Sequence, residues 1–302
     1  MDEIAQCFIN HRFVMLPVKT IFAAHDGSPG GKEALVTAAA WAEFFSAQLV
    51  VGHVDVMFSE QIALQSTSAG TSDPVAPILE DIDHLAKAYP NLQIEQVQRM
   101  DVAAAPALLE MSTTSGADLL VVGTHGRRGI QRMFLGSVAE EVARKASKPV
   151  LVARAGRSRL PKTILLPVDF SQFATNAIQP INALTASLGA SLMLAHVIEQ
   201  VLHPAFYQTG AMGIYDVLPD LTERSKEQLE QLYKQQGGAQ DSTEFRIRHG
   251  HAHVEISSVA EEEQIDLITM PTHGLRGLSH LLMGSVAERV VRFSQVPVLV
   301  WR

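Results

Sequence analysis

The sequence lacks several features that define whole classes of protein. Its single cysteine, Cys7, leaves no intrachain disulfide and fits a reducing compartment such as the cytoplasm. No apolar run approaches the roughly 18 residues that a membrane-spanning helix needs. The first residues, MDEIAQCFINHRF, carry acidic side chains where a secretory signal peptide needs basic ones. These absences predict a cytoplasmic protein with no membrane partner.

An excess of positive charge is also missing. The formal net charge of −8 at pH 7 argues against nucleic acid as a partner. A composition of 47% hydrophobic and 19% charged residues is typical of globular proteins with a sizeable core. A length of 302 residues predicts two domains of about 150 residues each.

The two halves of the chain repeat each other. The segment Thr20–Ser28, TIFAAHDGS, matches Thr163–Ser171, TILLPVDFS. Near the end of each half, GSVAEEVARKASKPVLV from Gly136 matches GSVAERVVRFSQVPVLV from Gly284. Such self-similarity indicates two copies of one structural unit. The expected organisation is an N-terminal arm at 1–18, a first domain at 19–154, a linker at 155–161 and a second domain at 162–302.

Each half alternates short apolar runs, typical of buried strands, with longer segments of helical periodicity. The expected strands are 19–25, 48–55, 93–99, 119–123, 149–154, 162–168, 191–198, 243–249, 266–270 and 297–301. In the first half the expected helices are 30–46, 75–89, 102–115 and 136–147. This alternation predicts an α/β fold of two tandem open parallel five-stranded sheets with helices on both faces. Ligands bind such sheets beyond the carboxyl ends of the strands, where Asp26, Val54 and Gly123 are expected to meet.

A glycine-containing loop connects a buried strand to a helix within Asp118–Ser137, DLLVVGTHGRRGIQRMFLGS. Ser137 is expected to cap that helix, whose free N–H groups and dipole suit a phosphate. Three arginines of the loop can add charge-assisted hydrogen bonds to it, namely Arg127, Arg128 and Arg132. The alternative is that the glycines only permit tight turns and close helix–sheet packing.

The spacing G-x2-G-x9-G-[ST] after a buried strand resembles the nucleotide-binding motif of the universal stress protein family, and the resemblance covers nearly the whole chain. It implies a Rossmann-like fold, a stress-response or regulatory role, and a bound adenine nucleotide: ATP, or else ADP or AMP, with or without magnesium. The binding residues that it implies in the first half are Asp26, Val54, Gly123, Gly126, Arg127, Gly136, Ser137 and Val138. A second, weaker site is implied at Asp169, Val197, Gly274, Gly284 and Ser285.

The halves differ at positions that matter for this motif. Pro271 stands in the second half where the first has Gly123, and its ring is expected to obstruct the close approach of a ligand. The second loop also carries one arginine, Arg276, where the first has three. Conversely, Val102 stands where the second half has Gly250, and its side chain can reach into the first crevice. Nucleotide is therefore expected in the first site, with the second site weakened.

Several histidines invite other interpretations. His53 and His196 end matching apolar runs and are interpreted as structural residues. The run RHGHAHVE would suit zinc if His249, His251 and His253 shared one face of a strand, but the glycine between the first two is expected to end that strand, so no metal is predicted.

No catalytic arrangement is legible beside the glycine loop, so the sequence favours a nucleotide-binding regulator over an enzyme. Two alternatives stay open: a slow ATPase, and an interaction scaffold or binder of another small ligand.

The final strands suggest how the two halves associate. Members of the family commonly pair through their last strands, and both halves end in matching apolar runs, Pro149–Val152 and Pro297–Val300. Unpaired strand edges are a liability that such pairing removes. The chain is therefore expected to form its own pseudo-dimer, with these strands adjacent and antiparallel. A homodimer of whole chains stays open.

Overall fold

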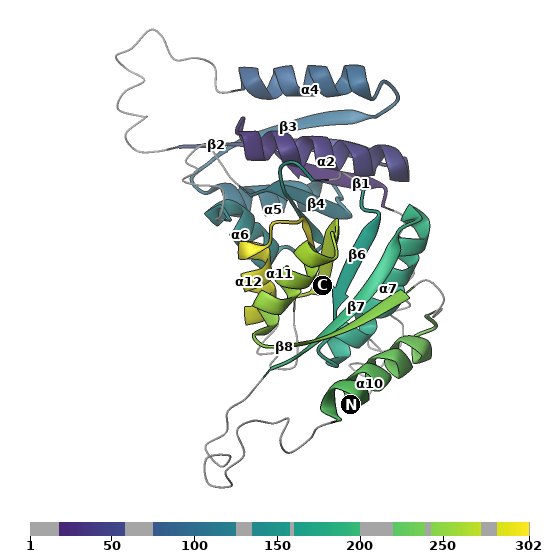
Figure 1. The fold of residues 1–302 in the computed structure, drawn as a ribbon. Coiled ribbons are helices and arrows are strands. Elements are labelled where there is room, and N and C mark those ends of the chain that lie inside the picture. Colours follow the sequence, from purple (N-terminus) through teal and green to yellow (C-terminus); the bar gives the residue numbers. More distant parts are fainter. Residues whose placement is uncertain are drawn as a thin grey trace, which may run out of the picture.

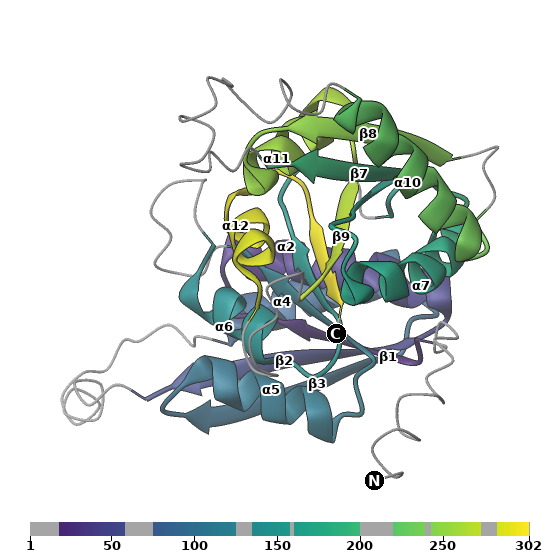
Figure 2. The same cartoon turned by 90° about the horizontal axis from the view of Figure 1, so that it is seen from below.

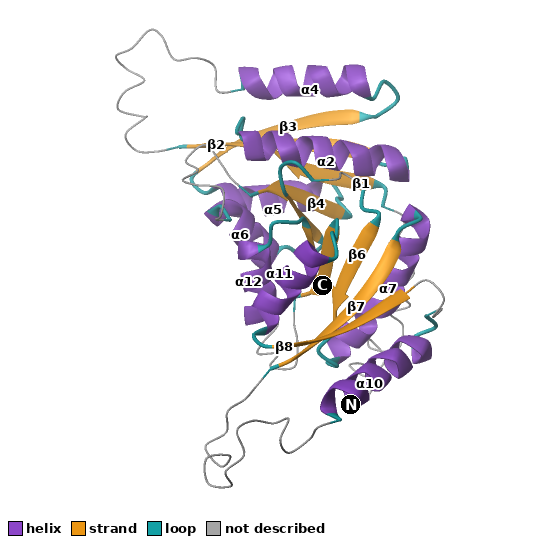
Figure 3. Ribbon diagram, in the orientation of Figure 1, coloured by secondary structure: helices purple, strands orange, loops and turns teal. Residues whose placement is uncertain are grey.

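The computed structural model describes residues 18–57, 75–124, 135–157, 160–199, 220–238, 243–272 and 283–301. The first copy contains β1 (Thr20–Ala24), α2 (Pro29–Phe45), β2 (Gln48–Val56), α4 (Ala76–Ala88), β3 (Ile94–Asp101), α5 (Ala104–Thr114), β4 (Leu119–Gly123), α6 (Ser137–Lys145) and β5 (Val150–Ala153). The second contains β6 (Thr163–Pro167), α7 (Gln172–Leu188), β7 (Ser191–Ile198), α10 (Leu221–Gln235), β8 (Thr243–His249), α11 (Ala252–Glu262), β9 (Leu267–Pro271), α12 (Ser285–Phe293) and β10 (Val298–Trp301). Every expected strand is present (Figure 3).

The two copies share one sheet of ten strands, in the order β3-β2-β1-β4-β5-β10-β9-β6-β7-β8 (Figure 1). Strands within each copy are parallel, whereas β5 and β10 run antiparallel with Leu151 opposite Leu299. These two leucines are equivalent in the repeat, so the pseudo-two-fold axis passes beside this pair. The predicted antiparallel pairing of the final strands is confirmed. The two expected five-stranded sheets are continuous because this pairing joins them.

Helices cover both faces of the shared sheet. Leu151 and Leu299 contribute to a core under α2 and α7 on one face, while Val150, Val152 and Val298 contribute to a core under α5, α6, α11 and α12 on the other. Each core therefore runs through both copies. Figure 2 shows α6 and α12 beside each other across the seam, where Arg292 Nη2 donates to Glu140 Oε1 at 2.7 Å.

The helices that follow β1 and β6 begin in the same way. The Ser28 hydroxyl accepts from the Gly31 N–H at the start of α2, and the Ser171 hydroxyl accepts from the Ala174 N–H at the start of α7. These caps satisfy N–H groups that have no partner within the helix. They fix the position at which each chain leaves the sheet and enters the helix. Within the described part of the chain, no helix has the length and apolar character to cross a membrane.

Candidate functional site

The candidate site lies where the strand order of the first copy reverses. β1 pairs with β2 on one side and with β4 on the other, so the connections that leave β1 and β4 diverge at their carboxyl ends. Ala23 lies opposite Val121 in this register, which brings the turn at Asp26 close to the end of β4. The sequence predicted this convergence, and the same arrangement recurs around β6, β7 and β9.

Asp26 and Asp169 occupy the same turn in the two copies. The Asp26 Oδ1 atom accepts from the Ser28 N–H at 3.0 Å, and the Asp169 Oδ1 atom accepts from the Ser171 N–H at 3.0 Å. The middle residue of each turn has a left-handed backbone, with φ 78° at Gly27 and φ 59° at Phe170. Each carboxylate is thereby fixed at the carboxyl end of the first strand of its copy.

Val54 presents its backbone to the same crevice. The Gly52 carbonyl accepts from the His25 N–H at 2.9 Å, and alternate residues of a strand direct their backbone groups to the same side. Val54 therefore directs its N–H and C=O towards the β1 side, at a level where β1 has already ended. Val197 lies equivalently beyond β6, because the Ala195 carbonyl accepts from the Val168 N–H at 2.8 Å. Val54 and Val197 therefore occupy equivalent positions in the two copies, each beyond the end of the first strand.

The helix that follows the glycine loop has no side-chain cap from the described residues. Gly136 is the N-cap of α6, with φ −65° and ψ 146°, and Ser137 is the first helical residue. The expectation that Ser137 caps the helix is therefore wrong, because Gly136 takes the extended conformation that a capping residue needs. Val138 follows in the first turn and is 38% exposed. No side chain of the described residues caps the first N–H groups of this helix, and uncapped groups of this kind bind anions.

In both copies a backbone hydrogen bond joins the residue that follows the fourth strand to the N-cap glycine of the next helix. The Gly136 N–H donates to the Thr124 carbonyl at 2.6 Å, and the Gly284 N–H donates to the Thr272 carbonyl at 2.6 Å. Gly284 is likewise the N-cap of α12, and Ser285 is the first residue of that helix. Other predicted motif residues lie outside the described residues: Gly126, Arg127, Arg128, Arg132, Gly274 and Arg276.

Gly123 has a packing role. A Cβ atom added to Gly123 would lie 2.0 Å from the Gly30 carbonyl oxygen, so only glycine lets the end of β4 approach the first turn of α2 this closely. Gly123 therefore permits the close helix–sheet packing that the sequence left open as an alternative role for the glycines. The aligned residues of the second copy are Pro271 and Phe173, so both members of the contact differ together.

Val102 and Gly250 occupy aligned positions in the two copies, and the difference between them also has a local explanation. Gly250 has φ 145°, a backbone conformation that favours glycine, and a Cβ there would lie 2.8 Å from Glu255 Oε1. Val102 is 73% exposed, so its side chain faces solvent beyond the end of β3.

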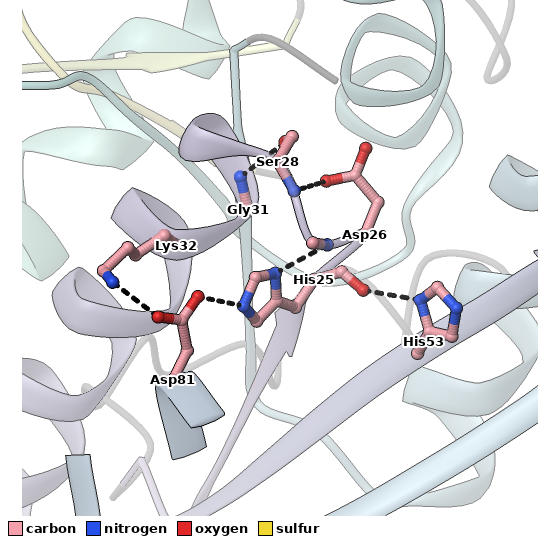
Figure 4. A network of polar contacts seen from close by, with 8 residues as sticks. His25, Asp26, Ser28, Gly31, Lys32, His53 and Asp81 are labelled. Atoms are coloured by element: carbon pink, nitrogen blue, oxygen red, sulfur yellow. Dashed lines mark hydrogen bonds and ion pairs between the residues drawn. The ribbon is translucent and has the colours of Figure 1, made fainter. Parts of the chain in front are cut away.

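A hydrogen-bonded network surrounds the Asp26 turn in the first copy (Figure 4). The His25 side chain is buried, and its Nδ1 atom lies 3.1 Å from the Gly27 nitrogen, which donates to it. Nδ1 is therefore an acceptor, so the proton is on Nε2, which donates to Asp81 Oδ2 at 3.1 Å. Lys32 Nζ donates to Asp81 Oδ1 at 2.5 Å. Burial lowers the pKa of His25 below 6.5, although Asp81 opposes this effect.

The network pairs a histidine with a carboxylate, as a catalytic triad does, but neither ring nitrogen of this neutral histidine faces a substrate position. Both ring nitrogens of His25 are already engaged, one with the Gly27 N–H and the other with Asp81. Sequence reasoning missed this network, because Asp81 lies on α4, far from Lys32 and His25 along the chain. The one available signal was the proximity of His25 and Lys32 to the predicted Asp26 turn.

The strand-end histidines are structural, as interpreted from the sequence. His53 Nδ1 donates to the His25 carbonyl at 2.8 Å, and His196 Nδ1 donates to the Val168 carbonyl at 2.7 Å. Burial lowers the pKa of His196 below 6.5. In the second copy the Phe170 ring packs on His196 with their centroids 4.5 Å apart.

The histidines of RHGHAHVE are distributed over two elements. His249 ends β8, His251 is the N-cap of α11, and His253 lies in the first turn of that helix. Among the residues that the structure describes, no group of three histidine, cysteine or acidic side chains is arranged to hold a metal ion.

A sequence model of the Universal stress protein family matches residues 17–154 and, a second time, residues 161–302. The chain belongs to the universal stress protein family. Universal stress protein MJ0577 of Methanocaldococcus jannaschii is 32% identical over 151 residues, which cover 46% of this chain and 93% of that protein. The crystal structure of a universal stress protein from Archaeoglobus fulgidus covers 94% of this chain and 98% of its own, with a TM-score of 0.61 and 18% identity. The resemblance inferred from the glycine motif is thus confirmed at the level of family and fold.

Proposed function

We propose that this universal stress protein is a regulatory protein of the stress response that binds an adenine nucleotide, ATP or else ADP or AMP, in its first domain, residues 19–154. The nucleotide phosphates would lie at the start of α6, near Gly136, Ser137 and Val138. The carboxylate of Asp26 would accept hydrogen bonds from the adenosine, and the backbone of Val54 would contact the adenine edge.

The observation that carries this proposal is the N-terminus of α6 near the Asp26 turn, where no side chain of the described residues caps the helix. Helix N–H groups without a capping side chain attract phosphate oxygens, and the helix dipole adds to that attraction. A binding role is favoured over catalysis, because the histidine nearest to Asp26 has both ring nitrogens engaged. Any hydrolysis of bound ATP would be slow, since no described residue is poised as a base.

Mass spectrometry of small molecules released on denaturing the purified protein, followed by calorimetry with ATP, ADP and AMP, tests the proposal. Gly136→Val places a branched side chain where the phosphates would approach, and should weaken binding at least ~10-fold, about 1.4 kcal/mol. Gly284→Val makes the same change in the second copy and should leave the affinity of the first site unchanged. Unchanged affinity in a folded Gly136→Val variant would contradict the proposal.

We also propose that the second domain, residues 162–302, binds nucleotide more weakly. Asp169, Val197, Gly284 and Ser285 have the same local geometry as their counterparts, whereas Pro271 replaces the first motif glycine. Calorimetric stoichiometry of wild type against Pro271→Gly tests this: a gain in stoichiometry or affinity is expected. If neither the stoichiometry nor the affinity changes, Pro271 does not obstruct nucleotide binding.

A further inference from the structure

The turn that carries the acidic residue is anchored differently in the two copies. In the second copy, the residue after Asp169 is Phe170, whose ring packs on His196. In the first copy that residue is Gly27, which has no side chain to pack and which loses more conformational freedom than any other residue when it is ordered. Its backbone N–H is instead held by His25 Nδ1 at 3.1 Å.

The residues around the His25 ring match this anchoring role. A Cβ added to Gly31 would lie 2.5 Å from His25 Nδ1, so a glycine is required beside the ring. The second copy has Val168 and Ala174 at the aligned positions, so the histidine and the glycine change together. Asp81 then fixes the orientation and tautomer of the ring, and its other oxygen is held by a lysine of α2 (Figure 4).

We propose that His25 is a positioning residue of the first nucleotide site: its neutral ring, held by Asp81 and Lys32, orders the turn that carries Asp26, and protonation of Nδ1 releases that turn. The first site then loses affinity for nucleotide in mild acid, whereas the second site has no equivalent response. This inference rests on the proposed nucleotide-binding function.

The physical basis is the single lone pair of Nδ1. That lone pair accepts either the Gly27 N–H or a proton, but not both. Asp81 from α4 and Asp26 favour the protonated ring, while burial and His53 from β2 disfavour it, and burial is the largest of these effects. The pKa of His25 is therefore below 6.5, and the turn is released only at a pH below that value.

Nucleotide binding at the second site should not respond to pH in this way, for a structural reason. Val168 replaces the histidine, so the aligned position offers no side-chain nitrogen to the turn. His196 donates its Nδ1–H to the Val168 carbonyl, and a donor keeps this bond whether or not the other ring nitrogen is protonated. Phe170 packs on that ring.

Two variants of the full chain separate the contributions of His25. In His25→Asn, the amide oxygen can occupy the place of Nδ1 and accept from Gly27, but it does not titrate. In His25→Val, which carries the residue found in the second copy, the acceptor is lost. Asp83→Asn, an exposed change two residues from Asp81 on α4, is the matched control.

The experiment measures ATP affinity by calorimetry at pH 7.5 and pH 5.5, and the protection of the Gly27 amide from hydrogen exchange in the ligand-free protein. At pH 7.5, His25→Asn should bind within about 3-fold of wild type and His25→Val at least ~10-fold more weakly. Between the two pH values, wild type should lose more affinity than His25→Asn, by less than ~10-fold because the pKa of His25 is below 6.5, and the titration of ATP itself cancels in this ratio. Gly27 protection should fall in His25→Val and stay unchanged in Asp83→Asn.

Equal Gly27 protection in wild type and His25→Val would overturn the proposal, as would a wild-type to His25→Asn affinity ratio that does not vary with pH. If His25→Val does not fold, the His25→Asn ratio still decides. If wild type binds no ATP at pH 7.5 while Gly27 protection depends on His25, the positioning role stands and the nucleotide-binding function fails.

Discussion

At the scale of single residues, the two copies build the same backbone with different side chains. The close approach of β4 to α2 needs Gly123 beside Gly30, whereas the second copy has Pro271 and Phe173 at these places. Both residues of this contact therefore differ between the copies. A side chain inserted at only one of them should therefore be poorly tolerated.

Gly123→Ala should destabilise the protein by about 1–3 kcal/mol, because its methyl group would meet the Gly30 carbonyl and the backbone on both sides would have to shift. Urea unfolding measures the effect. Pro271→Ala is the control at the aligned position, where a Cβ is already accommodated, and its expected change is under ~1 kcal/mol. Equal losses in the two variants would show that the contact with α2 is not the cause.

His196 should make stability depend on pH in a defined direction. Because burial lowers its pKa in the folded protein, the unfolded chain binds more protons below pH 6.5, and the free energy of unfolding falls as the pH decreases from 6.5 towards the folded pKa. This contribution is at most ~1.4 kcal/mol per pH unit and is absent above that window. His196→Asn keeps a donor for the Val168 carbonyl and should flatten the dependence in urea titrations between pH 5 and 8. The exposed His84→Asn change on α4 is the control, and an unaltered slope in His196→Asn would rule out this origin.

At the scale of elements, the helices that follow the first strand of each copy begin differently from those that follow the fourth strand. α2 and α7 begin at serines whose hydroxyls accept a backbone N–H, whereas α6 and α12 begin at glycines with no side-chain cap among the described residues. In the first pair a serine hydroxyl satisfies a backbone N–H, whereas in the second pair no described side chain does so. The N-termini of α2 and α6 lie at one edge of the shared sheet and those of α7 and α12 at the opposite edge, because β5 and β10 are antiparallel.

Ser28→Ala should cost about 1 kcal/mol of stability, since the Gly31 N–H would lose its cap. Chemical denaturation provides the measurement. Ser187→Ala, an exposed change inside α7, should alter stability by less than about 0.5 kcal/mol. A Ser28→Ala protein as stable as the Ser187→Ala protein would mean that water replaces the cap without loss.

The elements themselves were largely predictable from the sequence, because buried strands such as Leu119–Gly123 are short apolar runs bounded by glycine or polar residues. The Asp26 turn and the placement of Val54 followed from strand order. The capping role of Ser137 was mispredicted, because a one-residue difference in where a helix begins leaves no trace in periodicity. The contact of His25 with Asp81 joins residues with no shared pattern, so only the folded chain reveals it.

At the scale of the whole molecule, the seam between β5 and β10 makes the two copies one structural unit. Both cores cross this seam, and the buried Arg154 of the first copy donates from Nη2 to the Val291 carbonyl in the last turn of α12 at 2.5 Å. Burial lowers the pKa of Arg154 to about 10. Such continuity predicts that neither copy unfolds independently.

The two tryptophans of the sequence, Trp41 and Trp301, allow this to be tested copy by copy. In Trp41→Phe the remaining fluorescence reports on the second copy, and in Trp301→Phe it reports on the first. In each variant the urea midpoints from fluorescence and far-ultraviolet circular dichroism should coincide, as two-state unfolding requires. A biphasic dichroism curve accompanied by a single-step fluorescence curve would instead indicate two independent units.

The Leu151–Leu299 pair also has a consequence for how the two halves can diverge. In a homodimer built from one such unit, every substitution appears twice, and dilution separates the partners. Here the partners are covalently tethered, so their association is set by a fixed effective concentration and is insensitive to dilution. A substitution can therefore alter one crevice while the other keeps its residues. The differences at Gly27 and Phe170, and at Gly123 and Pro271, are changes that a symmetric assembly of identical chains could not contain.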